Sequence, residues 1–308
     1  MKRIAIAAGG TGGHITPALH VALKWQETGG ECVWFGRTQS LEQEVANKNN
    51  IQFISQSAVL LNWVKLPLTL VRLSQAIRQA RLNLTAHKIE AVFSTGAYVS
   101  FPIALAAKTL GIPLIIHEQN THMGKANRLL SRLTQNVCLG LPITGLNQHT
   151  MTGNPVFPRP VKRRNQHILV IGGSQGCSFF NEYAPRCIAK SNTQYPVVHL
   201  AGKKDQGVLE RYQDLGVEAE VYRYHHAIHE LYNDAVIVIA RSGAMTLAEL
   251  SYFGLPSILV PYPFATNDHQ RKNATYFVKR HAAMMVEEDP HQLGQAIDTL
   301  LHDLEHRQ

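Results

Sequence analysis

The chain has 308 residues, a length that suits two domains better than a single core. Apolar residues make up 45% of it and charged residues 17%, a composition that excludes a disordered chain. The net charge of +8 favours an acidic partner, such as a phosphorylated substrate, nucleic acid or an anionic membrane.

Neither a signal peptide nor a membrane-spanning helix is predicted. The N-terminal apolar run covers only residues 4–8, and no stretch approaches the roughly 18 uninterrupted apolar residues of a spanning helix. The cysteines are sparse and form no Cys-x-x-Cys pair, which argues against structural zinc and favours a reducing compartment. We expect a cytosolic protein that meets a membrane only at its surface.

Short apolar runs typical of strands alternate with helical patterns, which favours parallel sheets. In the first half, strands are expected at residues 3–7, 32–35, 91–94, 114–117 and 136–139, and helices at 17–28, 68–86 and 102–110. In the second half, strands are expected at 167–171, 197–200, 219–222, 236–240, 257–260 and 283–286, and helices at 178–190, 246–253, 267–280 and 291–305.

The pattern restarts near residue 166. RIAIAAGGTGGH at 3–14 and HILVIGGSQGCS at 167–178 both read as a strand, a glycine turn and a helix start. We expect two doubly wound α/β domains, 1–152 and 167–308. The linker between them is expected at 153–166, which is rich in proline and basic residues and lacks periodicity.

The two glycine turns suit a phosphate-bearing ligand. A helix N-terminus has unpaired N–H groups and partial positive charge, and glycine lets a phosphate approach the backbone. One such turn is weak evidence because glycine also serves tight geometry, but two at matching positions favour a nucleotide-linked substrate between the halves.

The turns do not fit a dinucleotide site or a P-loop. GTGGHI at 10–15 lacks the third glycine of Gly-x-Gly-x-x-Gly, and WFGR at 34–37 stands where a ribose-binding acid would close the second strand. No Gly-Lys-Ser/Thr follows either turn.

A third strand–turn–helix junction lies at residues 241–249, RSGAMTLAE. Its turn offers backbone donors to a diphosphate. Glu249, one helical turn after Thr246, can accept both hydroxyls of a ribose. The same spacing fits a capping box of Thr246 and Glu249, and the sequence leaves both interpretations open.

A fourth junction lies at residues 261–270. The amides of Gln270 and Asn273 suit sugar hydroxyls, whereas the alternative is an ordinary helix start capped by Asn267 or Asp268.

Eight motifs in chain order carry a specific resemblance: GGTGGH at 9–14, GAYVS at 96–100, HEQN at 117–120, GNPV at 153–156, GGSQG at 172–176, RSGAMTLAE at 241–249, GLP at 254–256 and DHQxxNA at 268–274. On these motifs the chain resembles the MurG family. These enzymes transfer N-acetylglucosamine from UDP-GlcNAc to lipid I, forming lipid II. The resemblance implies the GT-B fold, in which two Rossmann-like domains flank a cleft, with the acceptor and membrane on the N-terminal domain and UDP-GlcNAc on the C-terminal one.

The resemblance also implies the site residues. Donor binding is assigned to Thr11, Gly12, Gly13, Asn120, Ser174, Gln175, His225, Arg241, Ala244, Met245, Thr246, Leu247, Ala248, Glu249 and Gln270. Glu249 would bind the ribose, and His225 would contact uracil by its backbone, because its side chain differs from the family's apolar residue. Acceptor binding is assigned to Thr11, His14, Tyr98 and Asn127.

The implied reaction inverts the anomeric carbon and needs a base for the acceptor hydroxyl. His14 is the candidate, since a neutral imidazole accepts a proton near pH 7. Alternatively His14 only caps or orients its loop, and a loop asparagine or an acceptor diphosphate oxygen takes the proton. No Asp-x-Asp pair occurs, so no metal or other cofactor is predicted, and helix N-termini would stabilise the leaving UDP.

Residues 45–89 contain no acid but six Lys or Arg residues with interleaved apolar residues, including Trp63. Such a surface suits an anionic bilayer, and it predicts a peripheral enzyme at the cytoplasmic face of the bacterial plasma membrane. The alternative is that Leu70, Leu73 and Ile77, at helical spacing, belong to the core. Other cell-wall synthesis proteins are candidate partners.

Two departures from the family pattern keep other functions open. Phe157 follows GNPV where the family has arginine, and Phe101 stands in a glycine's place. One alternative is a UDP-sugar-dependent GT-B enzyme with a different lipid acceptor. Another is a catalytically weakened or silent UDP-sugar-binding protein. Nucleic-acid binding is not favoured, because no recognised module occurs.

Overall fold

The computed structural model describes residues 2–58, 66–162, 164–173, 175–225 and 227–305; in 66–68 and 304–305 it describes the backbone only. The chain divides into two compact units, Met1–Phe157 (the first unit) and Pro158–Gln308 (the second unit). The division falls within the segment expected as the linker, 153–166. None of the described helices is long and apolar enough to span a membrane.

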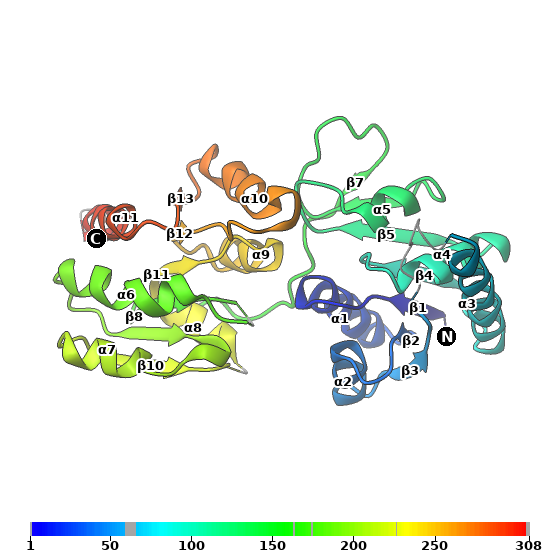
Figure 1. Ribbon diagram of the computed structural model, residues 1–308, viewed down its shortest axis with the longest axis horizontal. Coiled ribbons are helices and arrows are strands. Elements are labelled where there is room, and N and C mark those ends of the chain that lie inside the picture. The colour runs from blue at the N-terminus through cyan, green and yellow to red at the C-terminus, as the bar shows by residue number, and fades with distance from the viewer. Residues whose placement is uncertain (1, 59–65, 163, 174, 226, 306–308) are drawn as a thin grey trace. The chain divides into compact units, whose positions relative to one another are not determined.

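The first unit is built on a parallel sheet of order β3-β2-β1-β4-β5-β6-β7 (Figure 1). Its strands are β1 (Arg3–Ala7), β2 (Glu31–Gly36), β3 (Gln52–Ser55), β4 (Ala91–Ser94), β5 (Leu114–Glu118), β6 (Val137–Leu139) and β7 (Thr150–Met151). Its helices are α1 (Gly12–Glu27), α2 (Leu41–Lys48), α3 (Leu66–Ala86), α4 (Ser100–Thr109) and α5 (Lys125–Leu130).

Both faces of this sheet are buried, which explains why its strands are continuous apolar runs. Successive residues of β1 alternate between two cores: Ala5 and Ala7 pack with α3 and α4, while Ile4 and Ile6 pack with α1.

The second unit repeats the plan with a parallel sheet of order β10-β9-β8-β11-β12-β13 (Figure 1). Its strands are β8 (His167–Ile171), β9 (Val197–Leu200), β10 (Ala219–Tyr222), β11 (Ala235–Ala240), β12 (Ser257–Leu259) and β13 (Met284–Met285). Its α-helices are α6 (Ser178–Lys190), α7 (Val208–Asp214), α8 (Ile228–Asp234), α9 (Ala244–Phe253), α10 (His269–Val278) and α11 (Pro290–Glu305), and two 3-10 turns are η1 (Gly202–Lys204) and η2 (Thr266–Asp268).

The predicted doubly wound α/β architecture is confirmed in both units. In each sheet the first strand in the sequence pairs on one side with the second strand and on the other with a later strand, β4 or β11. The winding of each sheet reverses between β1 and β4 and between β8 and β11. The turns that follow the two strands of such a pair meet at the carboxyl edge of the sheet, which is where ligands of open α/β sheets bind.

Candidate functional site

The first unit places His14 against the turn after β4. His14 lies in the first turn of α1, and its Nδ1 is 2.8 Å from the backbone oxygen of Thr95. Because a carbonyl only accepts, Nδ1 carries the proton in this bond and Nε2 keeps its lone pair. The Thr95 hydroxyl in turn donates to the His14 carbonyl at 2.8 Å. The ring is thus held as a tautomer that can accept a proton at Nε2.

The glycines at the start of α1 face open space. A Cβ built on Gly12 would meet no atom within 4 Å, and one on Gly13 would meet only the Thr11 hydroxyl, at 3.7 Å. Thr11 is the N-cap residue and its side chain makes no capping hydrogen bond. Packing therefore does not require glycine at residues 12 and 13, and the helix N-terminus stays accessible to an anionic ligand.

The loop after β5 is organised by the buried carboxylate of Glu118. It accepts hydrogen bonds from the Asn120 backbone at 3.2 Å and side chain at 3.1 Å, from the Gly124 backbone at 2.9 Å and from the Asn127 side chain at 3.0 Å. Asn120 and Asn127 were predicted to bind substrate. Both use an amide N–H on Glu118, and Asn127 is buried, so the structure gives them a role in shaping the loop.

His117 and Gln119 of the HEQN motif join this loop to the GNPV motif. His117 Nε2 lies 3.0 Å from the Gly153 carbonyl, to which it donates, and Gln119 donates to His117 Nδ1 at 3.1 Å. Burial lowers the pKa of His117, which keeps the ring neutral. Asn154 closes the connection by donating to the Gln119 carbonyl at 3.1 Å.

The glycine turn of the second unit is packed more tightly than that of the first. A Cβ on Gly176 would lie 2.3 Å from the Ala201 carbonyl oxygen, and one on Gly202 would lie 2.4 Å from Gly176. A close approach of two backbones therefore explains Gly176 without a ligand. Gly173, by contrast, has φ of +82° and an open Cβ position.

The helix after β11 begins earlier than the sequence predicts. Gly243 is its N-cap residue, in an extended conformation and without a side-chain cap. Thr246 is thus the third helical residue and Glu249 the sixth, so the capping-box interpretation is wrong. Glu249 instead accepts a hydrogen bond from the Tyr232 hydroxyl at 2.8 Å. Burial raises the pKa of Glu249 to about 7, and the Tyr232 bond opposes that shift.

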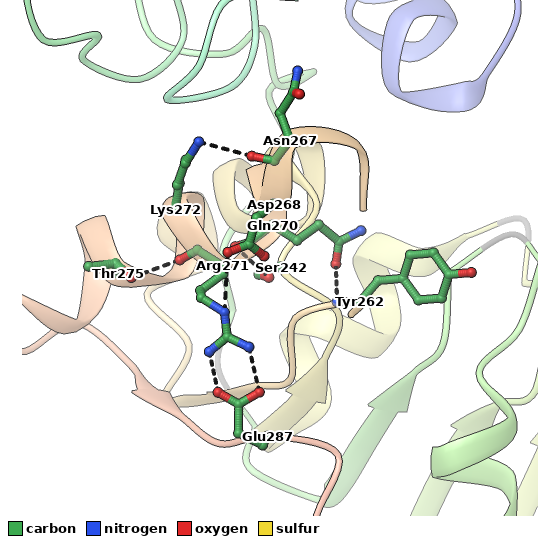
Figure 2. Close-up of polar contacts among 9 residues, drawn as sticks. All are labelled: Ser242, Tyr262, Asn267, Asp268, Gln270, Arg271, Lys272, Thr275 and Glu287. Carbon is green, nitrogen blue, oxygen red and sulfur yellow. Dashed lines mark hydrogen bonds and ion pairs between the residues drawn. The ribbon is translucent and has the colours of Figure 1, made fainter. Parts of the chain in front are cut away.

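Gln270 connects the two predicted donor-binding junctions (Figure 2). The buried Ser242 hydroxyl donates to the Gln270 carbonyl at 2.9 Å, and Asn273 donates to the Ser242 carbonyl at 3.3 Å. The Gln270 side-chain oxygen accepts from the Tyr262 backbone at 3.0 Å. Figure 2 shows its amide nitrogen turned away from that contact.

The helix start at α10 is not an ordinary capped one. Asn267 and Asp268 both have left-handed backbone conformations, with φ of 55° and 53°. Asp268 occupies the N-cap position but makes no side-chain cap, and its carboxylate lies 3.3 Å from Nε of Arg271. The capping alternative for Asn267 and Asp268 is therefore wrong. Asn and Asp are the non-glycine residues that most readily adopt this conformation, so the pair forms an irregular turn before α10.

Arg241, predicted to bind the donor, is engaged with its own unit. Its guanidinium donates to the carbonyls of Val260 at 3.1 Å and Pro261 at 3.0 Å, pairs with Glu288, and lies 5.5 Å from the centre of the Tyr262 ring. These contacts brace the loop that carries Tyr262.

The remaining predicted residues are placed as follows. Tyr98 and Gln175 are exposed, and Leu247 is buried in the core, so that only its backbone is available. Ser174 lies outside the described residues. In the second unit, Ala244 is buried, whereas His225, Met245, Thr246 and Ala248 are half-buried, as are Arg241, Glu249 and Gln270 described above.

Sequence reasoning missed Thr95, Glu118 and Tyr232. Thr95 and Glu118 each stand where a strand of the sheet ends, and a polar residue there is a usable signal. Tyr232 gives no such signal, since it reaches Glu249 from another helix.

Comparison with known proteins places the chain in a family. Residues 4–139 match the glycosyltransferase family 28 N-terminal domain, and residues 167–308 match the family 28 C-terminal domain. A protein of Neisseria meningitidis serogroup B and one of Pseudomonas putida are each 37% identical, over 92% of this chain and 85% and 84% of their own lengths. Both are named UDP-N-acetylglucosamine--N-acetylmuramyl-(pentapeptide) pyrophosphoryl-undecaprenol N-acetylglucosamine transferase.

A solved structure agrees. The crystal structure of Acinetobacter baumannii MurG superposes with a TM-score of 0.83 at 29% identity, over 99% of this chain and 92% of that one. Both halves of the chain thus match family 28 domains, and its curated relatives and this structural neighbour are transferases of one kind. The chain belongs to the MurG family of GT-B glycosyltransferases.

Proposed function

We propose that this protein transfers N-acetylglucosamine from UDP-GlcNAc to the muramoyl 4-hydroxyl of lipid I, with inversion, giving lipid II. The relatives that it matches over 92% of its length carry the name of that activity. Within the chain, the observation that carries the proposal is the His14 ring, whose Nδ1 bond to Thr95 leaves Nε2 as a base.

The second unit is proposed to hold the donor. Backbone N–H groups of Met245 and Thr246, in the first turn of α9, stabilise the diphosphate, whose negative charge grows as UDP leaves. The Glu249 carboxylate accepts the two ribose hydroxyls, and the Gln270 amide binds the sugar. Tyr232 positions Glu249 by its 2.8 Å hydrogen bond.

The first unit is proposed to bind the acceptor diphosphate at the open N-terminus of α1, residues 11–13. As the 4-hydroxyl oxygen forms its bond to the anomeric carbon, His14 Nε2 takes the hydroxyl proton. The bond between the anomeric carbon and UDP breaks on the opposite face, and UDP leaves with the electron pair. The protein itself is unchanged except for a proton on His14, which solvent removes.

The test is UDP release from UDP-GlcNAc with a lipid I analogue. Release that requires the analogue supports the proposal. A protein that binds UDP-GlcNAc but releases no UDP would be the silent binding protein, and release only with another lipid would identify a different acceptor.

The two departures from the family pattern, Phe101 and Phe157, both pack against neighbouring side chains of the first unit. Phe101 is partly buried against the core formed by α4 and its sheet. Phe157 lies against His20, with ring centres 6.1 Å apart.

We further propose that α3 contacts an anionic membrane. One side of the helix is core, with Ala76, Ala80 and Leu84 buried. The other side exposes apolar and basic residues together: Leu70, Val71, Leu82, Arg72, Arg78 and Arg81. Leu73 and Ile77 are half-buried. The helix therefore has both the core and the surface character that the sequence left open, while Trp63 lies outside the described residues.

Membrane binding is expected to depend on these arginines. Each basic residue near an anionic surface contributes about 1 kcal/mol, so R78Q/R81Q should weaken partitioning onto phosphatidylglycerol liposomes by roughly 30-fold in co-sedimentation. R186Q, which removes an exposed arginine of α6 in the second unit, is the matched control and should bind as the wild type does. Binding that is indifferent to the anionic lipid content would contradict the proposal.

A further inference from the structure

Glu42 is a buried carboxylate beneath the glycine turn of the first unit. It is the second residue of α2 and is fully buried. Its Oε2 lies 3.4 Å from the Gly10 backbone nitrogen, and its Oε1 lies 3.3 Å from the Arg37 backbone nitrogen. It therefore joins the turn after β1 to the end of β2. We propose that Glu42 is a positioning residue for residues 9–13, here called the acceptor turn, an inference that rests on the proposed function.

Two glycines make room for this side chain rather than for a ligand. A Cβ on Gly9 would lie 2.7 Å from Glu42 Oε1, and a Cβ on Gly36 would lie 2.6 Å from Glu42 Cγ. Real Cβ atoms do not approach so closely, so a side chain at either position would force Glu42 to shift from its observed place. In dinucleotide-binding folds an acid at the end of the second strand meets the ribose of the ligand. Here the chain brings its own carboxylate to the underside of the turn.

The carboxylate is stabilised by groups of the turn and of its own helix. A buried charge is costly unless it is hydrogen-bonded and paired. Glu42 has two backbone N–H donors, the Arg37 guanidinium at 3.6 Å and the N-terminus of α2, a position that favours negative charge. Losing the carboxylate would leave those donors without their acceptor.

The hydrogen bond from the Gly10 N–H to Glu42 affects which side of the acceptor turn is left for a ligand. Gly10 has φ of +88° and an open Cβ position, and Gly12 and Gly13 follow with open positions of their own. Glu42 thus holds the turn from below, while the N–H groups at the start of α1 remain directed outward for the acceptor diphosphate. It touches no substrate in this arrangement, and acts through the backbone of the turn.

The first test separates acceptor from donor effects. E42Q keeps the size of the side chain but presents an amide where one oxygen accepted, so we expect the KM for a lipid I analogue to rise about tenfold or more. The KM for UDP-GlcNAc should stay within twofold. E44Q alters an exposed glutamate in the same turn of α2 and is the matched control. An E42Q enzyme with unchanged KM values, or with both raised equally, would overturn the assignment.

A second measurement does not depend on activity. We expect the Gly10 amide, followed by NMR without substrate, to exchange its hydrogen at least tenfold faster in E42Q than in E44Q. Equal exchange overturns the inference even for an inactive protein, whereas a wild type that releases no UDP would overturn only the proposed function. If E42Q fails to fold, the double variant G9A/E42A decides, because the alanine methyl can occupy the vacated space. If the losses in free energy of unfolding caused by G9A and by E42A simply add in the double variant, the contact between the two residues is refuted.

Discussion

Replacing His14 by alanine is expected to lower kcat for UDP release by about 10²- to 10⁴-fold, the usual contribution of a positioned general base. The variant loses the Nε2 lone pair that the Thr95 carbonyl, 2.8 Å from Nδ1, keeps available. Affinity for UDP-GlcNAc should change little, because the ribose and sugar contacts are proposed for the second unit. Single-turnover kinetics with a lipid I analogue would measure the loss in the chemical step.

His20 provides the control for His14. It lies on the same helix, α1, and its Nδ1 is 2.7 Å from the Pro155 carbonyl. H20A removes a histidine of similar burial without touching the proposed base, so kcat should stay within a few-fold of the wild type. If H14A also kept its kcat within a few-fold, His14 would only orient the loop, and the proton would have to pass to another group.

Replacing Glu249 by alanine is expected to weaken UDP-GlcNAc binding by roughly 10- to 100-fold, because hydrogen bonds to a charged group contribute about 1.5–3 kcal/mol. The variant loses the acceptor for the ribose hydroxyls and leaves the Tyr232 hydroxyl without its partner. Titration calorimetry with UDP-GlcNAc and with UDP would measure the loss of affinity. Unchanged affinity would show that the ribose is bound elsewhere.

The same residue should give a pH signature in stability. Burial raises the pKa of Glu249 from 4.5 to about 7, so between these values the folded protein binds the proton more tightly than the unfolded chain does. The tighter proton binding adds up to about 3 kcal/mol to the free energy of unfolding. This stabilisation is fully present below pH 4.5 and is lost as the pH rises through 7. E249Q should therefore melt at a higher temperature than the wild type at pH 8, with the difference shrinking toward pH 5.

Donor binding should follow the opposite trend, because the ribose hydroxyls need the ionised carboxylate. Wild-type affinity for UDP-GlcNAc is expected to fall below pH 7, while that of E249Q stays low throughout. For the stability prediction, a difference in melting temperature between E249Q and the wild type that is the same at pH 5 and at pH 8 would contradict the buried-carboxylate account. Glu249 would thus destabilise the empty protein in the pH range in which it binds the donor.

The strands at the sheet centres were predictable, and two short strands were not. Apolar runs such as those of β1 and β11 are buried on both faces, so their composition alone predicts a strand. β3 has four residues, none fully buried, and β7 has two exposed ones. Such strands carry too few apolar residues for a pattern, and their pairing comes from the sheet beside them.

The candidate site was predictable as a set of residues but not as a set of contacts. The two glycine turns look alike in sequence, yet a Cβ on Gly12 would meet open space and one on Gly176 would meet the Ala201 carbonyl. The difference arises because the segment after β9, which is distant in the sequence, passes against Gly176. Glu42 likewise reaches Gly10 from another helix, and Glu118 gathers donors from a loop that folds back upon it. Local patterns do not encode such contacts.

The exposed face of α3 bears its charge solely on Arg72, Arg78 and Arg81. Guanidinium groups stay protonated throughout the physiological pH range, so acidification of the surroundings leaves this face unchanged. Ionic strength does not: the Debye length falls from about 10 Å at 0.1 M salt to about 3 Å at 1 M. The proposed attraction of this helix to an anionic surface is therefore expected to weaken as the salt concentration rises and to change little with pH.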